Sequence, residues 1–211
     1  MWEQRWAWSS KPSWWDGAWR RGLEVLSAQG RHVETRPDTY LVLAGRPDAG
    51  LKLRGGRDDD FDLKVRHRVS DGWELWEKVA YFKWDALEAV RLAAMLRVPL
   101  PDLRRLQAAT PAQGVEVFLT AAGLAPSRAV VDKKRVQCQA ADLLQSLPGM
   151  RFEPDCVTEL VELRLPERTE PFFSLCIESM SPGPAVAEGS DHAATLRCGY
   201  PELLIRSLRT R

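Results

Sequence analysis

The sequence predicts an α+β fold in which an antiparallel β-barrel, or a strongly curved sheet, carries helices on its outside. Two observations lead to this prediction. Short runs with strand-like alternation recur along the chain, and a helical pattern interrupts them between about residues 85 and 123. Several of these runs also place charged residues on one face and apolar residues on the other, so the apolar faces need helices to cover them.

The first strand-like run, Met1 to Ser9, alternates between two kinds of side chain. Glu3 and Arg5 fall on one side, and Trp6 and Trp8 fall on the other. Six of the nine tryptophans lie within the first 19 residues. Because large rings dominate the burial of apolar surface, we expect a packed aromatic cluster that closes one side of a sheet. The alternative is a stacking platform for bases or sugars.

An antiparallel meander is expected next. Turn signals separate its runs, and the strongest is Asp71-Gly72, a pair that favours the tight turn whose twist matches paired strands. The predicted strands are Tyr40 to Leu43, Leu51 to Arg54, Phe61 to Val69 and Trp73 to Trp84.

The helical insert, at about 85–123, begins where the period of the pattern changes. Asp85 with Glu88 three residues later resembles a capping box, which predicts a helix from Ala86 to Val98. We expect this helix to pack through an apolar stripe made of Leu87, Val90 and Ala94. Two further helical runs are predicted, at Asp102 to about Ala109 and around Val115 to Ala122.

Strands resume after the insert, and no linker divides the chain. We therefore predict a single domain over residues 1–211 that ends in a loop-rich segment, about 180–211, with a short helix near its end. The later predicted elements are strands at Ala129 to Gln139, Val157 to Leu165 and Phe172 to Ser179, and the helix at Pro201 to Leu208.

The overall charge is balanced, with 30 Lys and Arg against 29 Asp and Glu and a net charge of +1. This balance gives no bulk argument for a nucleic-acid or membrane partner. No apolar run approaches about 18 residues, and the start lacks the order of a signal peptide. The four cysteines form no CxxC pair. Reduced, buried thiols in a cytoplasmic protein are the expectation.

The charged strand faces are the strongest functional signal. A polar strand face is normally solvated, but the repetition here favours the lining of a concave surface, with Leu53, Leu63 and Val65 packed under helices. Cations with interspersed carboxylates suit a phosphate chain and a divalent metal. The candidate phosphate-binding residues are Arg5, Lys52, Arg54, Lys64, Arg66, Arg68, Lys133 and Arg135, and the candidate metal ligands are Glu3, Glu74, Glu162 and Glu178.

The order of motifs resembles that of a known superfamily. The segments LKLRGG, FDLKVRHR, GWELWEK, VVDKKRVQC, TELVEL and FFSLCIES, within residues 1–179, look like those of the CYTH-type triphosphate tunnel proteins. The resemblance implies an eight-stranded antiparallel barrel that acts on triphosphates with Mg²⁺ or Mn²⁺. It also implies that Glu162 and Glu178 correspond to carboxylates of the late strands of that superfamily.

One motif departs from the superfamily's pattern. Its members carry Glu-x-Glu-x-Lys near the N-terminus, whereas this chain has Glu3, then Arg5 at the second glutamate position and Ala7 at the lysine position. We therefore name no catalytic residue and expect weaker metal dependence. The prediction is a divergent tunnel-fold protein that binds a triphosphate, polyphosphate or nucleotide, with metal-dependent triphosphate hydrolysis as one option. The alternatives are a non-catalytic phosphate-ligand module and a protein-interaction domain.

Overall fold

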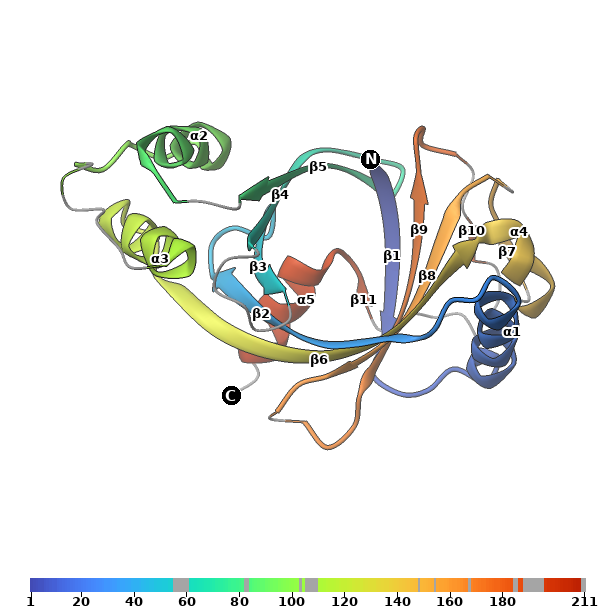
Figure 1. The fold of residues 1–211 in the computed structure, drawn as a ribbon. Helices are drawn as coiled ribbons and strands as arrows, with labels where there is room; N and C mark the ends of the chain where they lie inside the picture. Colours follow the sequence, from blue (N-terminus) through green and yellow to red (C-terminus); the bar gives the residue numbers. More distant parts are fainter. Residues whose placement is uncertain are drawn as a thin grey trace. The chain divides into compact units, whose positions relative to one another are not determined.

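The structure is a computed structural model that describes residues 1–54, 61–81, 84–102, 104, 110–147, 149–153, 155–166, 168–183, 186–187 and 196–209. Strands dominate the chain, and Figure 1 shows them with the helices. The longer elements are β1 (Trp2–Trp8), α1 (Trp15–Ala28), β2 (Glu34–Leu43), β3 (Ala49–Arg54), β4 (Phe61–Ser70), β5 (Trp73–Tyr81), α2 (Ala86–Leu96), α3 (Pro111–Ala121), β6 (Pro126–Gln139), β8 (Val157–Arg164), β9 (Phe172–Ser179) and α5 (Tyr200–Arg209). The short ones are α4 (Ala140–Leu143), η2 (Leu144–Ser146), β7 (Met150–Arg151), β10 (Val186–Ala187) and β11 (Leu196–Arg197).

The strands pair in the order β11-β1-β5-β4-β3-β2-β6-β8-β9, and β1 also pairs with β9. Because β1 bonds to both β5 and β9, eight of these strands close on themselves. The registered pairs are antiparallel. The predicted fold class, an α+β antiparallel barrel, is therefore confirmed. Strands β7 and β10 form a separate two-stranded sheet.

Two compact units make up the chain, and each is assembled from three stretches of sequence. Unit 1 comprises Met1–Arg36, Arg68–Trp76 and Asp132–Gly199, and unit 2 comprises Pro37–His67, Glu77–Val131 and Tyr200–Arg211. The single domain over residues 1–211 stays a prediction. The units are described separately below.

The core of unit 1 is the predicted tryptophan cluster. Trp15 is fully buried, stacks on Trp19 at 5.7 Å between ring centroids, and meets Phe173 edge-on at 5.1 Å. Trp6 and Trp8 of β1 are buried in the same cluster. These rings are core residues, so the expectation of a packed cluster is confirmed and they offer no exposed stacking platform.

Helix α1 was not among the predicted elements. Its buried residues nevertheless follow the helical spacing of one face: Trp15, Ala18, Trp19, Gly22, Val25 and Leu26. Gly22 permits close packing on β6, because a Cβ there would lie 2.5 Å from Cγ1 of Val136. The dense tryptophans made the start of this segment look like a continuation of the aromatic cluster, which concealed the helical period.

In unit 2 the apolar strand faces pack under helices, as predicted. Leu53, Leu63 and Val65 are buried in one cluster with residues of α2 and α3. The stripe of α2 that makes this contact was predicted wrongly, since Leu87 and Val90 are 60% and 45% exposed. The buried stripe consists of Ala89, Leu92, Ala93 and Leu96. Both stripes have helical spacing, but the small alanines let α2 approach the strands more closely.

Several local predictions hold. Asp71 and Gly72 both have positive φ, 50° and 81°, as the predicted hairpin turn between β4 and β5 requires. The side chain of Asp85 accepts a hydrogen bond from the Glu88 amide at 2.9 Å and so caps α2. The predicted C-terminal helix is α5. The predicted helix from Asp102 to Ala109 falls mainly outside the described residues.

Replacing Leu92 by Ala should destabilise the protein, because Leu92 is 1% exposed and its truncation leaves a cavity between α2 and the strands. We expect a loss of about 2–4 kcal/mol in the free energy of unfolding, measured from urea denaturation. Leu87→Ala is the matched control and should cost less than about 0.5 kcal/mol, since that side chain is exposed. Equal losses in the two variants would contradict this packing.

Candidate functional site

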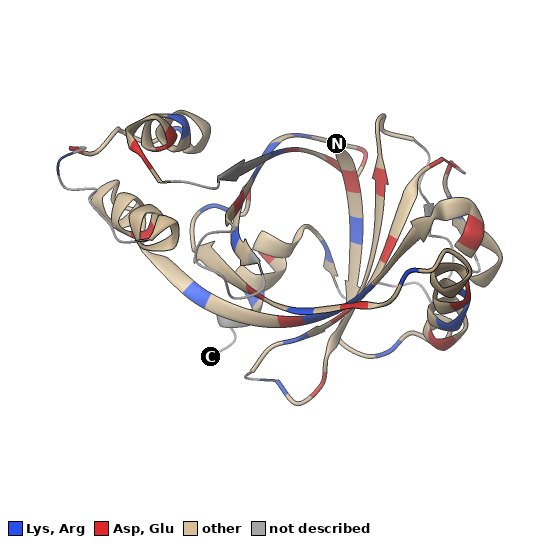
Figure 2. Ribbon diagram, viewed as in Figure 1, with Lys and Arg blue, Asp and Glu red and all other residues tan. Residues whose placement is uncertain are grey.

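The charged face of unit 1 is ordered by strand register. Residues directly opposite one another in an antiparallel pair project to the same side of the sheet. Glu3 of β1 lies opposite Glu74 of β5 and also opposite Glu178 of β9. We call these three residues the glutamate row. On the same face, the strand pairings also align Arg5 with Glu159 across β9. Figure 2 shows basic and acidic residues along the strands of the sheet.

A buried ion-pair network centres on Glu159. Arg5 donates from Nη1 and Nη2 to Oε1 of Glu159, both at 3.1 Å, and from Nη1 to Oγ of Ser174 at 3.1 Å. Arg135 donates from Nη1 to the other carboxylate oxygen, Oε2, at 2.9 Å and also contacts Glu34. Arg5 and Glu159 are 6% and 5% exposed, so this ion pair is shielded from water.

The charge of Glu159 is fixed by its neighbours. Burial alone would raise the pKa of this carboxyl group, but the positive charges of Arg5, Arg135 and Lys133 outweigh that effect and hold the pKa well below its ordinary value. Lys133 is itself buried on β6. Three of the predicted phosphate-binding cations therefore gather around one carboxylate.

A group of potential metal ligands lies on the same face. Among the residues that the structure describes, ligand atoms of Glu3, Cys176 and Glu178 lie within 4.8 Å of one another. Cys176 is fully buried, Glu3 is buried and Glu178 is half-buried. Burial raises the pKa of the Cys176 thiol well above its ordinary value, although the charge of Arg5 acts in the opposite direction. Two of the four predicted metal ligands are thus brought together.

The other two predicted metal ligands, Glu74 and Glu162, lie on opposite faces of the sheet. Glu74 belongs to the glutamate row, and its carboxylate accepts a hydrogen bond from the indole of Trp76 at 3.1 Å. Glu162 lies on the opposite face of β8, where it is aligned with Lys134 and Phe173. That face packs against the tryptophan core, which includes Phe173, so Glu162 does not lie on the face of the glutamate row. The reason is its odd spacing from Glu159, because side chains alternate along a strand.

In unit 2 the predicted cation Lys52 of β3 pairs with two buried acids. Lys52 lies 3.7 Å from Asp38 and 3.9 Å from Asp62, two carboxylates that are almost fully buried. Lys64 is half-buried and lies on the same face of β4 as Asp62. The side chain of Arg54 lies outside the described residues. Arg68 belongs to unit 1 and is exposed.

Helix α5 packs on this charged face of unit 2. Glu202 of α5 pairs with Arg66 at 4.0 Å, and Tyr200 meets the ring of Tyr40 at 6.3 Å between centroids. A Cβ at Gly50 would lie 2.9 Å from Pro201, which shows how closely the helix approaches β3. Arg66 therefore already forms an ion pair with a carboxylate of this chain.

The four cysteines are free and buried, so the expectation that they are buried is confirmed. Burial raises the pKa of Cys138 to about 11, so this thiol is protonated and unreactive at neutral pH. No helix among the described residues is long and apolar enough to cross a membrane.

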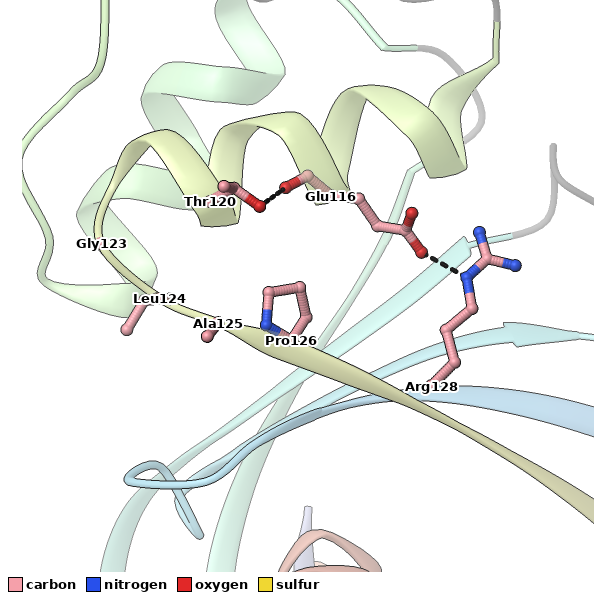
Figure 3. Close-up of a pocket in the computed structure, with 7 residues that line it drawn as sticks. All are labelled: Glu116, Thr120, Gly123, Leu124, Ala125, Pro126 and Arg128. Carbon is pink, nitrogen blue, oxygen red and sulfur yellow. Dashed lines mark hydrogen bonds and ion pairs between the residues drawn. The ribbon is translucent and has the colours of Figure 1, made fainter.

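A separate cavity in unit 2, of about 470 Å³, lies where α3 runs into β6 (Figure 3). Arg128 donates to Glu116 across it at 2.6 Å. Gly123, with φ of 80°, makes the turn out of the helix. None of the predicted site residues lines this cavity. The candidate site is therefore the charged face of unit 1.

Comparison with known proteins gives no match to any family model or to any curated protein. Similar solved structures include the PH1012 protein of Pyrococcus horikoshii, at 11% identity over 85% of this chain and 80% of that one, with a TM-score of 0.38. A Bacillus halodurans protein named as a candidate adenylate cyclase matches at 10% identity over 84% and 80%, with a TM-score of 0.35.

A Hippeastrum protein, also named as a candidate adenylyl cyclase and described as having a dominant triphosphatase activity, matches at 13% identity over 86% of this chain and 80% of that one, with a TM-score of 0.38. Structural similarities with TM-scores this low do not support a fold assignment. The fold assignment rests on the strand pairings. The closed antiparallel barrel agrees with the architecture implied by the resemblance to the CYTH-type superfamily.

The paired state of Glu159 predicts a pH dependence of stability. A carboxyl group whose pKa is lowered on folding binds fewer protons in the folded state than in the unfolded state. Its stabilisation is therefore complete above the ordinary value of 4.5 and is lost as the pH falls from there toward the lowered pKa. We expect the free energy of unfolding to fall over this window and to fall less steeply in Glu159→Gln.

The same variant should lose about 3–5 kcal/mol at neutral pH, because it leaves Arg5 and Arg135 without their shared carboxylate. Urea denaturation at a series of pH values measures both effects. Glu162→Gln, on the opposite face of the same strand, is the control and should keep the wild-type slope. An unchanged slope in Glu159→Gln would contradict the network.

Proposed function

We propose that the charged face of unit 1 binds a phosphate-rich anion together with a divalent cation. The anion is a triphosphate, a polyphosphate or the phosphate chain of a nucleotide. The proposal rests on one observation: Arg5 and Lys133, both 6% exposed, lie on the same sheet face as the glutamate row. Buried charges of both signs cost free energy, so their concentration on one face points to a binding site.

The two kinds of charge suit two parts of such a ligand. Guanidinium and ammonium groups neutralise phosphate oxygens through charge-assisted hydrogen bonds. Carboxylates hold a divalent cation that also bridges to phosphate oxygens. The cations Arg5, Lys133 and Arg135 would take the first role, and Glu3 and Glu178 would take the second.

The position of Arg5 favours binding over turnover. Arg5 stands where the superfamily that the sequence resembles carries a second metal-binding glutamate, and it is held by Glu159 and Ser174. A phosphoryl-transfer site needs a metal and a group that orients the nucleophile. A non-catalytic module for phosphate-rich ligands is therefore the second candidate function, and hydrolysis of triphosphate separates the two.

The binding test is a titration of tripolyphosphate, without metal and with Mn²⁺ or Zn²⁺, followed by calorimetry. The wild type should bind, and added metal should strengthen binding. Lys133→Met removes one buried positive charge but keeps the length of the side chain. A charge-assisted hydrogen bond contributes about 1.5–3 kcal/mol, so this variant should bind roughly tenfold more weakly or worse.

Lys134→Met is the matched control, because Lys134 is the next residue of β6 and lies over the ring of Trp19 on the other face. It should bind tripolyphosphate as the wild type does. Release of inorganic phosphate from the same mixtures reports turnover. Equal weakening by both variants would show a general charge effect, and no binding by the wild type would rule out the proposal.

A further inference from the structure

We propose that Cys176 is a metal ligand together with Glu3 and Glu178, and that this site selects a thiophilic divalent ion such as Zn²⁺ over Mg²⁺. The inference deepens the metal half of the proposed function by naming the class of ion. It concerns metal binding alone, so it can be tested without any phosphate ligand.

The geometry brings the three donors together on two neighbouring strands. Glu3 is directly opposite Glu178 in the β1–β9 pair, and Cys176 precedes Glu178 by two residues on the same face of β9. Their ligand atoms lie within 4.8 Å of one another. Ligands around a tetrahedral zinc ion at about 2.0–2.3 Å lie about 3.3–3.8 Å apart, so small side-chain rotations would close the site.

Electrostatics favour a cation at this position. Like charges directly opposite one another in a sheet are destabilising, and Glu3 faces carboxylates on both neighbouring strands. Arg5 lies 4.0 Å from Glu3, and its guanidinium donates hydrogen bonds to Glu159 and Ser174. A divalent ion between Glu3 and Glu178 would offset the repulsion within the glutamate row.

The sulfur decides which ion is preferred. Mg²⁺ binds oxygen ligands and dehydrates reluctantly, whereas thiolate ligands select Zn²⁺ and related softer ions. Cys176 would bind as a thiolate, so formation of the metal–sulfur bond breaks the S–H bond and releases the proton to solvent. Three protein ligands also leave a fourth position for water or a phosphate oxygen, as in catalytic zinc sites. Glu178 is half-buried, unlike the other two ligands, and marks the side from which an ion can enter.

The test is a titration of the metal-free protein with Co²⁺ and Cd²⁺, read by the ultraviolet charge-transfer absorption that a metal–thiolate bond produces, and by calorimetry with Zn²⁺ and Mg²⁺. The wild type should show the band with one equivalent of metal, and Mg²⁺ in excess should not remove it. Cys176→Ser should lose the band and bind Zn²⁺ about tenfold more weakly or worse, since even outer-shell changes cost about 10–100-fold.

Cys138→Ser is the matched control, because Cys138 is also buried in unit 1 but packs in the tryptophan core. It should keep the band and the wild-type affinity for Zn²⁺. Glu178→Gln should weaken Zn²⁺ binding and tests the site at a half-buried residue, should Cys176→Ser fold poorly. The proposal is overturned if the wild type shows no thiolate band, or if the band survives in Cys176→Ser and Zn²⁺ affinity is unchanged in Glu178→Gln. Failure of tripolyphosphate binding would leave this result untouched.

Discussion

The charged face of unit 1 depends on one carboxylate held between two guanidinium groups. One carboxylate oxygen of Glu159 accepts hydrogen bonds from Arg5, and the other accepts a hydrogen bond from Arg135. A carboxylate that is 5% exposed stays charged only if such partners offset its lost hydration. The two arginines come from β1 and β6, and β8 carries Glu159. The ion pairs therefore hold three strands in one register as well as fixing the charges of the site.

This network also defines the ligands available beside it. Arg5 is directed toward Glu159 and Ser174, and its guanidinium lies 4.0 Å from the carboxylate of Glu3. Glu3 lies between Glu74 and Glu178 on the neighbouring strands. Cys176 stands directly opposite Arg5, and its sulfur lies within 4.8 Å of carboxylate oxygens of Glu3 and Glu178.

The sequence was enough to predict the two faces of most strands but not their partners. Alternation separates Lys133 and Arg135 from Val136 and Cys138 on β6, and the structure has the same division. Alternation does not separate the two faces of β8, because Leu160 and Val161 lie on opposite faces and are both fully buried. Its pattern cannot tell which glutamate faces the core, so Glu162 was chosen and Glu159 was missed. The partners Arg5 and Glu159 are 154 residues apart, and no local signal links them.

Prediction from the sequence has the same limit for the helices: local features can be predicted, but the packing partners cannot. The capping residues of α2 correctly predicted where it begins, because capping is local chemistry. The predicted buried stripe of α2 was wrong because two stripes of this helix have the same period. Which of them is buried depends on the strands that the helix packs against. Helix α1 was missed since its tryptophans were attributed to the sheet, although their spacing was helical.

The pairing of Arg5 bears on the expected role of metal. In the sequence, Arg5 stands where the superfamily that the chain resembles carries a second glutamate, so the loss of that ligand led us to expect weaker metal dependence. In the structure Arg5 forms an ion pair with Glu159, which already offsets part of its positive charge. An incoming polyphosphate would also meet the carboxylates of the glutamate row, which repel it. A divalent ion held by Glu3 and Glu178, as proposed above, would reverse that repulsion, so we expect metal to strengthen anion binding.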